Sequence, residues 1–545
     1  MGWLCSQTPC TVVGVTEETK LQTETRTRLV KRLNLSDLSP GACPAFRTRK
    51  PGSRVKTPRQ RTVDAPFLLG AIREGVIRRL LGGKDRNELQ GWLSSRFPRL
   101  TSTESEWLLE AIGGFPDPSG DGLRILEGPV VLQKSCGECV WELTAWGIWA
   151  ASDDGEQRRI YLLRYSDHAA PYELARIAAA ALCAANGVSA ETPRPWEWHH
   201  QPHRLRDNEL QPRHIEVVEY FVGNRTGRER FSGPPSLART LYDTNAKDAA
   251  RTARKHEVRR PGRDCDGCAL IPDCPEVPTI RGLLGVSASG ADRGTWSATN
   301  GRYYSQCPRR DHLHRQHLPG APQSIPEQVG RAVDARLTAL HRRGRTCTLN
   351  DVPWTAADWR NHDFELSAEQ STVAATALSR HASELCPLRN GASIESVQPV
   401  VDLIAFDPDC NTVVHAQPDL LYREEGEWVW RETKVTQRLP WTSEDLLAGR
   451  HRIQLAIAVL MMSDGVLGEA PASRVELETL NDGGCDIEYI DVTDPAEVDR
   501  AREVISAVTA PWRVNRSTDT NPGEACRWCP YANSCPDAAI DGGSA

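Results

Sequence analysis

The clearest pattern of apolar and polar positions lies between Gln417 and Lys434. Two short apolar stretches flank a polar turn around Glu424–Gly426, which predicts a β-hairpin. On the second strand Glu432 and Lys434 stand two positions apart, and alternate side chains of a strand point to the same face. Asp419 begins the first strand and can come alongside them across the hairpin. The pattern therefore predicts two carboxylates and one ammonium group on one face of a hairpin.

Two longer apolar stretches, at 176–188 and 454–466, align with each other without a gap. The first 35 or so residues are polar and rich in Thr, Glu and Arg, which predicts a flexible leader over 1–35. No apolar run approaches the length of a membrane span, so we expect no membrane association. The N-terminus also lacks the basic and apolar regions of a signal peptide, and we therefore expect a cytoplasmic protein.

The spacing of the cysteines repeats along the chain. Each of two sets has one cysteine followed by proline, then a gap of 222 or 219 residues, then a C-x2-C-x5-C motif. Such repetition predicts two related halves, and 545 residues are enough for two domains, which we place at 36–285 and 286–545. The first set is Cys43, Cys265, Cys268 and Cys274, and the second set is Cys307, Cys526, Cys529 and Cys535.

Each cysteine set is a candidate metal site. Four thiolates can hold a [4Fe–4S] cluster or a zinc ion, and the spacing leaves both open. In a cytosolic chain the 17 cysteines do not predict a disulfide framework. Because one ligand comes from one end of each domain and three come from the other, such a site would staple the two ends together and stabilise the fold.

The net charge of −6 hides an asymmetry between the halves. Residues 1–275 hold 40 basic and 34 acidic residues, whereas residues 276–545 hold 26 and 38. Binding to a phosphate backbone needs local positive charge, and the arginine-rich runs at 47–61 and 251–263 are candidates for it. The same runs are equally consistent with solvated surface arginines.

Lysine is rare in this chain, with nine in total, and Lys434 is the only one after Lys255. An ammonium group and a guanidinium group are not interchangeable, so a lysine in an arginine-rich chain indicates a specific chemical role. Two carboxylates with an ammonium nearby suit a hard divalent cation and a metal-bound water. The alternative is a half-exposed strand that carries solvated charges.

Pro418-Asp419 and Glu432-Thr433-Lys434 resemble the motif of the PD-(D/E)xK nuclease superfamily. Together with the cysteine sets and Cys307-Pro308, they resemble the RecB-like branch that carries an iron–sulfur staple. The resemblance covers about residues 290–540. It implies an α/β fold of the restriction-endonuclease type, with a mixed central sheet flanked by helices.

The resemblance also implies roles for individual residues. Asp419 and Glu432 would bind Mg²⁺ or Mn²⁺, and Lys434 would orient the attacking water. Asp334 replaces the family's metal-binding histidine and would be an additional ligand. Gln454 would orient the lysine or contact the nucleic acid, although Ala458 replaces the tyrosine that follows it in the family.

The first half has a carboxylate, Glu74, where Asp334 stands, but it lacks the other residues. Gly147 aligns with Asp419, the strand at 159–166 has no Glu-x-Lys, and Arg176 aligns with Gln454. Without ligands, a hydrolytic metal site cannot form. We interpret the first half as a degenerate copy that keeps the fold and the cysteine staple, and that either binds DNA or supports the other half.

The sequence thus predicts tandem restriction-endonuclease-like α/β domains, the second of which is a divalent-metal-dependent DNA nuclease. It would act in DNA repair, recombination or defence against foreign DNA, and DNA is favoured over RNA only by the resemblance. The chain has no P-loop motif, and thus no evident helicase or ATPase motor of its own. The alternative is a non-catalytic iron–sulfur or zinc scaffold that binds nucleic acid for a partner enzyme. A further alternative is a nuclease that is active only in complex with a helicase or a defence-system protein.

Overall fold

A computed structural model describes most of the chain from residue 29 to residue 538. Two predicted features fall largely outside the described residues: the polar leader, up to residue 28, and the arginine-rich run at 47–61, of which only Arg47 is described. Among the described residues, no helix combines the length and the apolar character needed to cross a membrane. The described ranges are 29–47, 68–136, 139–165, 173–194, 201–206, 211–255, 257–288, 292–321, 324–362, 364–390, 394–436, 445–468, 471–481, 483–515 and 518–538.

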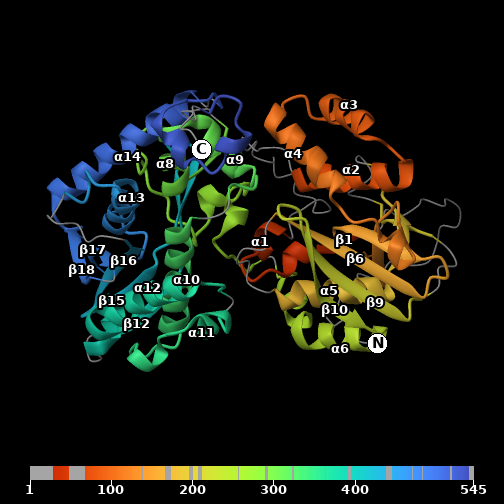
Figure 1. The fold of residues 1–545 in the computed structure, drawn as a ribbon, viewed down its shortest axis with the longest axis horizontal. Helices are drawn as coiled ribbons and strands as arrows, with labels where there is room; N and C mark the ends of the chain where they lie inside the picture. The colour runs from red at the N-terminus through yellow and green to blue at the C-terminus, as the bar shows by residue number, and fades with distance from the viewer. Residues whose placement is uncertain are drawn as a thin grey trace, which may run out of the picture. The chain divides into compact units, whose positions relative to one another are not determined.

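The chain divides into two compact units. Among the described residues, the first unit holds 29–47, 68–264 and 316–319, and the second holds 265–315 and 320–538. Each unit contains mixed β-sheets flanked by helices, which confirms the α/β class of the restriction-endonuclease-like type (Figure 1).

The larger sheet of the second unit has the strand order β12-β15-β16-β17-β18. The β16–β17 pair is parallel and the other pairs are antiparallel. The β15–β16 pair is the predicted hairpin, and its turn residues Glu425 and Gly426 have φ of 51° and 89°, as a type I′ turn requires. The strands are β12 (Ile394–Pro399), β15 (Leu420–Glu424), β16 (Glu427–Val435), β17 (Ala472–Leu480) and β18 (Cys485–Asp491).

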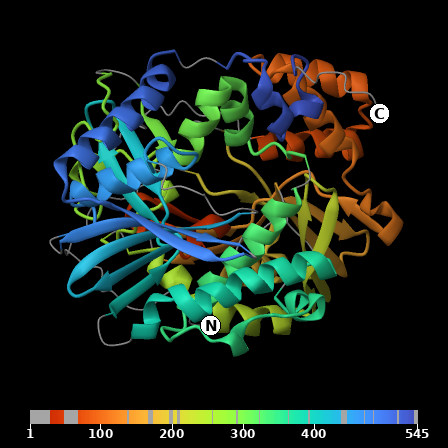
Figure 2. The same cartoon turned by 60° about the vertical axis from the view of Figure 1, so that its left-hand side comes forward.

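Helices cover both faces of this sheet. On one face, α13 (Arg452–Ser463) packs against Trp430 and Val475 in the largest apolar core of the unit. On the other face, α10 (Ile325–His341) and α12 (Ala368–Arg380) pack against Val435 and Leu480. Figure 2 shows the green and teal helices on one side of the blue strands and the blue helices on the other. The two faces of β16 therefore meet different helices.

A smaller sheet completes the second unit, with the order β11-β14-β13. The β11–β14 pair is parallel and the β13–β14 pair is antiparallel. Its strands are β11 (Gly294–Ser297), β13 (Leu403–Asp407) and β14 (Thr412–Ala416), and the remaining helices are α8 (Ala298–Gln306), α9 (Pro308–Arg315), α11 (Ala356–Arg360) and α14 (Pro495–Asn515).

The first unit repeats the same strand arrangement. Its sheet β10-β9-β6-β5-β2 has one parallel pair, β6–β9, in the place of β16–β17. Its other sheet begins β1-β4-β3, with one parallel and one antiparallel pair as in β11-β14-β13, and continues into β7 and β8. The strands are β1 (Leu29–Asn34), β2 (Leu123–Ile125), β3 (Val130–Cys136), β4 (Cys139–Thr144), β5 (Ile148–Ser152), β6 (Gln157–Arg164), β7 (Val188–Glu191), β8 (Arg204–Leu205), β9 (His214–Phe221) and β10 (Thr226–Gly233).

The core of the first unit is built around α5 (Leu174–Asn186), the counterpart of α13. Every residue of α5 from 177 to 185 is buried, and seven of these nine are Ala or Cys. Such small side chains allow the helix to lie close to the sheet and to α6 on its other side. The other helices are α1 (Pro44–Arg47), α2 (Leu68–Gly82), α3 (Arg86–Arg96), α4 (Ser102–Gly113), α6 (Pro235–Asn245) and α7 (Lys247–Thr252).

Candidate active site

The hairpin brings Asp419, Glu432 and Lys434 together. Asp419 directly precedes β15, and Glu432 and Lys434 lie on the face of β16 that meets α13. Lys434 Nζ lies 3.1 Å from Asp419 Oδ2 and 3.1 Å from Glu432 Oε2, and it donates to both. The backbone N–H of Thr433 also donates to Asp419 Oδ2, at 2.7 Å. One ammonium group is thus shared between two carboxylates.

Glu432 is buried, with 1% of its surface exposed. Trp430 Nε1 donates to its Oε1 at 2.8 Å, and the Gln454 side-chain amide on α13 donates to its Oε2. Burial, and then the negative charge of Asp419, raise the pKa of Glu432 to about 8, against the opposing effect of Lys434. A buried carboxyl whose pKa is raised this far lacks enough positive charge nearby, which a metal cation would supply.

Lys434 stays charged in this environment. Burial lowers its pKa, but the charges of Glu432 and Asp419 outweigh burial and raise the pKa above the usual lysine value. About a fifth of the side chain is exposed, so solvent reaches part of it. The lysine can therefore contact both the carboxylates and a water molecule or phosphate that enters from solvent.

Asp334 lies on α10 and is open to solvent on one side. Partial desolvation of its carboxyl, and then the charge of Asp419, raise its pKa to about 6. The charge of Asp419 thus acts on the carboxyl of Asp334, although Asp334 makes no direct contact with Asp419 or Glu432 among the hydrogen bonds of the described residues.

His451 is a neighbour of the site that sequence reasoning missed. It precedes α13 at the N-cap position, three residues before Gln454. Burial, and then the positive charge of Lys434, lower its pKa to about 4, so its imidazole is neutral at neutral pH. The sequence signal that could have indicated this residue is its position between Arg450 and Arg452, one helical turn before Gln454.

The donor set fits a hard divalent cation. Asp419, Glu432 and Asp334 offer carboxylate oxygens, which Mg²⁺ and Mn²⁺ prefer. Burial, and then the negative charge of Asp419, raise the pKa of both Glu432 and Asp334, and a nearby cation would favour the ionised form of both carboxyls. The arrangement can bind a metal at its carboxylates and present Lys434 beside it.

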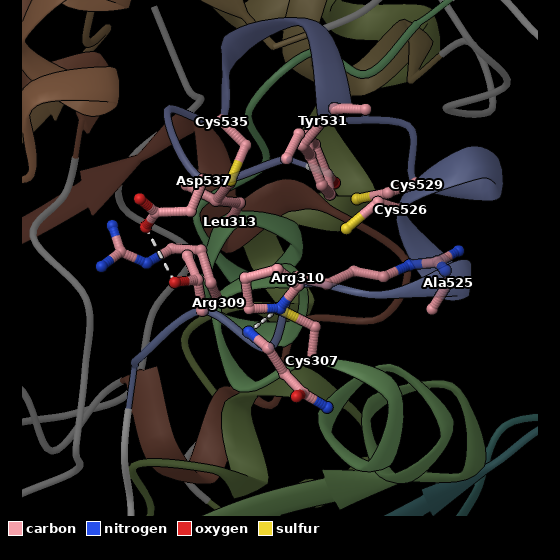
Figure 3. A pocket seen from close by; sticks show the side chains of 15 residues that line it. Cys307, Arg309, Arg310, Leu313, Ala525, Cys526, Cys529, Tyr531, Cys535 and Asp537 are labelled. Carbon is pink, nitrogen blue, oxygen red and sulfur yellow. Dashed lines mark hydrogen bonds between the residues drawn. The ribbon is translucent and has the colours of Figure 1, made fainter. Parts of the chain in front are cut away.

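The second cysteine set lines a single pocket. Figure 3 shows Cys307, Cys526, Cys529 and Cys535 around this pocket, with Arg310 and Tyr531 between them. The backbone N–H of Asn521 donates to Cys307 Sγ at 3.4 Å. The two ends of the domain thus meet here, as a staple requires.

The first cysteine set is spread over both compact units. Cys43 belongs to the first unit, and its backbone N–H donates to Asp264 at 2.8 Å. Cys265, Cys268 and Cys274 belong to the second unit, where Cys265 packs with Ile271 and Phe406. A four-cysteine site formed from this set stays a prediction.

The positions of the first unit that correspond to Asp419, Glu432 and Lys434 carry no carboxylate. Gly147 directly precedes β5 as Asp419 precedes β15. Because Ile148 pairs with Tyr161 and Leu420 pairs with Arg431, the counterpart of Glu432 is Leu162 and that of Lys434 is Arg164. Leu162 is buried in the apolar core. This part of the first unit therefore has no ligands for a divalent cation.

Residues 295–536 match the family model of the PD-(D/E)XK nuclease superfamily. This part of the second unit is therefore similar to the domains of that superfamily, whose fold is that of metal-dependent nucleases. The matched region begins at β11 and ends just after Cys535, so it includes the hairpin and the second cysteine set. A comparison with curated proteins gave no significant match.

Proposed function

We propose that the second unit is a divalent-metal-dependent nuclease that hydrolyses DNA phosphodiester bonds. The observation that carries this proposal is the convergence of Asp419, Glu432 and Lys434 at the base of one hairpin, with Gln454 donating to Glu432. The family match over 295–536 supports the same conclusion.

Asp419 and Glu432 would hold Mg²⁺ or Mn²⁺, and Asp334 would be an additional ligand. The bound metal supplies a Lewis acid that polarises a phosphodiester oxygen and lowers the pKa of a coordinated water. Lys434 would orient the attacking water and favour its deprotonated form. Gln454 and Trp430 fix the orientation of Glu432, so the buried carboxylate is already in place before a cation binds.

We further propose that Cys307, Cys526, Cys529 and Cys535 hold a [4Fe–4S] cluster, with zinc as the alternative. Their common pocket and their far-apart positions in the sequence support a stabilising staple. This staple, together with the order of motifs in the sequence, favours the RecB-like branch of the superfamily.

The first unit would be a degenerate copy of the second. The matching strand orders of the two units support a tandem duplication, and Gly147, Leu162 and Arg164 at the corresponding positions support the loss of its metal site. It would bind DNA or support the active unit. A helicase or a defence-system protein is the proposed partner, in repair, recombination or defence.

Cleavage of labelled single- and double-stranded DNA with Mg²⁺ or Mn²⁺ tests the function. The protein should be purified without oxygen to protect a cluster. We expect the wild type to cleave DNA, EDTA to abolish this cleavage, and the Lys434→Ala variant to be inactive. Lys84→Ala is the matched control, because Lys84 is half exposed and forms only a helix-surface ion pair with Glu88.

Two other outcomes would redirect the proposal. Equal cleavage by the wild type and Lys434→Ala would point to a contaminating nuclease. No cleavage with intact metal binding would favour the non-catalytic scaffold, or an enzyme that needs its partner, and addition of a helicase would separate these two.

A further inference from the structure

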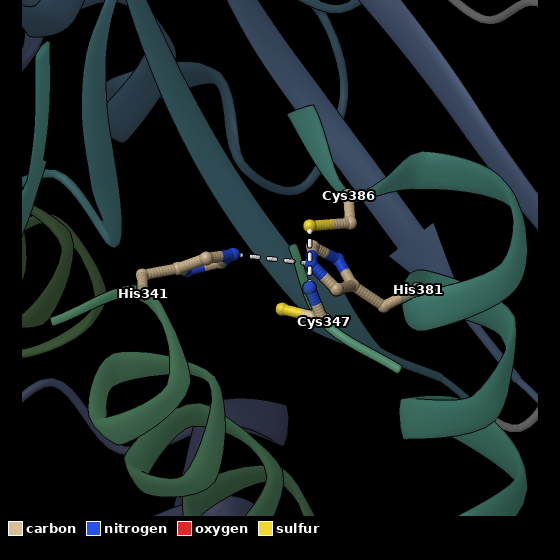
Figure 4. Close-up of side chains that lie close together, drawn as sticks. All are labelled: His341, Cys347, His381 and Cys386. Atoms are coloured by element: carbon tan, nitrogen blue, oxygen red, sulfur yellow. Dashed lines mark hydrogen bonds between the residues drawn. The ribbon is translucent and has the colours of Figure 1, made fainter. Parts of the chain in front are cut away.

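Four metal-binding side chains converge on the face of β16 and β17 opposite the candidate active site. They are His341, Cys347, His381 and Cys386, whose ligand atoms all lie within 4.8 Å of one another. Each side chain is buried, with 1–4% exposed. Figure 4 shows that they point toward a common centre. Neither cysteine belongs to the repeated sets.

The four residues come from three separate segments. His341 is the last residue of α10, and Cys347 lies in the loop that follows. His381 begins a π-helical turn, His381–Leu385, and Cys386 directly follows that turn. π-Helical turns are rare and often occur at functional sites. Thr346 Oγ1 donates to the carbonyl of Leu388 at 2.7 Å and ties the two cysteine-bearing segments together.

We propose that this cluster binds one zinc ion through two cysteines and two histidines. The Nε2 atoms of His341 and His381 are 3.2 Å apart. Two ligands of a tetrahedral zinc with Zn–N bonds of 2.0–2.1 Å are separated by about 3.3 Å, so the observed spacing fits without rearrangement. Four protein ligands and full burial leave no open coordination position, which makes this a structural site.

The surroundings of the cluster also suit zinc. His381 Nδ1 lies 2.6 Å from Glu478 Oε1, which directs Nε2 of the same ring toward the other ligands. A carboxylate that holds a metal-binding histidine in this way is a recurring feature of zinc sites. The backbone N–H of Cys347 donates to Cys386 Sγ at 3.4 Å, as an N–H does to a thiolate.

Charge balance is consistent with a dication at this place. Glu476 and Glu478 on β17 are buried and are paired with Arg431 and Arg474, and Arg474 also pairs with the more exposed Glu424. Zinc with two thiolates adds no net charge to this buried network. Burial of an unbalanced charge would be costly, so neutrality is a requirement that the proposed site meets.

The proposed zinc site is connected to the candidate active site through two routes. Glu478 Oε2 accepts from Thr433 Oγ1 at 2.9 Å, and the backbone N–H of Thr433 donates to Asp419. In addition, α10 carries Asp334 two helical turns before His341. Zinc would therefore hold in place both the strand and the helix that carry carboxylates of the site. This effect on activity rests on the proposed nuclease function, whereas zinc binding itself does not.

Zinc content and X-ray absorption at the zinc edge test the proposal on the full-length wild type. We expect a zinc ion with two sulfur and two nitrogen neighbours. If the second cysteine set also holds zinc, its four sulfur neighbours would add to the spectrum, so the nitrogen contribution is the decisive signal. A wild type that binds no zinc, or that shows sulfur neighbours alone, would overturn the proposal.

Variants separate this site from the second cysteine set. Cys347→Ser with Cys386→Ser should lower the zinc content by one ion per chain, whereas Cys410→Ser, which removes another fully buried cysteine, should leave it unchanged. His381→Cys should keep the zinc and change its neighbours to three sulfurs and one nitrogen. An unchanged coordination in His381→Cys would contradict the assignment even if the double variant fails to fold.

Discussion

The affinity of the candidate active site for Mn²⁺ should depend on the ionisation of Glu432. Burial and the charge of Asp419 raise the pKa of Glu432 to about 8, so a proton competes with the cation for this carboxylate at neutral pH. The ionised fraction is about one half at pH 8 and about one hundredth at pH 6. Mn²⁺ binding should therefore weaken roughly fifty-fold between pH 8 and pH 6, or about 2.3 kcal/mol.

Calorimetric titration of Mn²⁺ at several pH values measures this dependence. Mn²⁺ prefers oxygen ligands, so the cysteine-containing sites should not compete for it. Near pH 6.5, binding should release about one proton per metal ion, which the buffer dependence of the heat reports. Asp334, whose pKa is about 6, contributes only about a factor of two over this range, and Asp334→Asn removes that contribution.

Glu432→Gln should abolish the pH dependence together with most of the affinity. Glutamine keeps the shape of the side chain and an acceptor for Trp430, so the fold should be retained. The reasoning would be refuted if the wild type bound Mn²⁺ equally well at pH 6 and pH 8, or if Glu432→Gln bound it like the wild type.

The remaining predictions concern the groups around Glu432 and the opposite face of the strand. Lys434→Ala should abolish cleavage while Mn²⁺ binding measured by calorimetry stays the same or tightens, because a cation 3.1 Å from both carboxylates is removed; weaker binding would contradict this. Gln454→Leu removes a hydrogen-bond donor from the buried Glu432, which should lower the free energy of unfolding by about 1–3 kcal/mol. It should also move the midpoint of the pH dependence of Mn²⁺ binding to higher pH, and an unchanged midpoint would argue against the contact. Glu478→Gln should lower the free energy of unfolding in urea by about 3–5 kcal/mol, because the buried His381 loses its carboxylate partner at 2.6 Å and Arg431 keeps only Glu476, whereas Glu384→Gln at the surface should change little. In the metal-free protein, the free energy of unfolding should fall as the pH rises from about 4.5 to about 8. The reason is that Glu432 ionises near pH 4.5 in the unfolded chain and only near pH 8 in the folded chain. A free energy of unfolding that does not change over this range would contradict the raised pKa.

The hairpin and its charged residues were predictable because their signals are local. Alternation of apolar residues and a turn at Glu424–Gly426 define the two strands, and the register of a two-residue turn then determines which residues face each other. Asp419 and Glu432 are only 13 residues apart in the sequence, so no long-range information was needed to bring them together. The α/β class followed from the family resemblance.

The histidine–cysteine cluster was not predicted, because its ligands share no short motif. His341 and Cys347 are six residues apart, and His381 and Cys386 are five apart, so the cluster has no C-x2-C pair. Only the packing of α10 and the π-helical turn against the same sheet brings the two pairs together. The surroundings of His451 likewise depend on Lys434, which is close in space and not adjacent in sequence.

The side chains of β16 alternate between two different environments, and this alternation has a consequence for misfolding. Glu432 and Lys434 face α13, while Arg431 and Thr433 face the buried ion pairs on the other side. A slip of this strand by one residue would exchange the two sets, because side chains alternate with a period of two. Arg431 would then enter the place of Glu432, and Glu432 would enter the place of Thr433, beside the buried carboxylate of Glu478. An insertion of one residue in the hairpin should therefore yield an unstable chain that is cleared from the cell, rather than a stable but inactive protein.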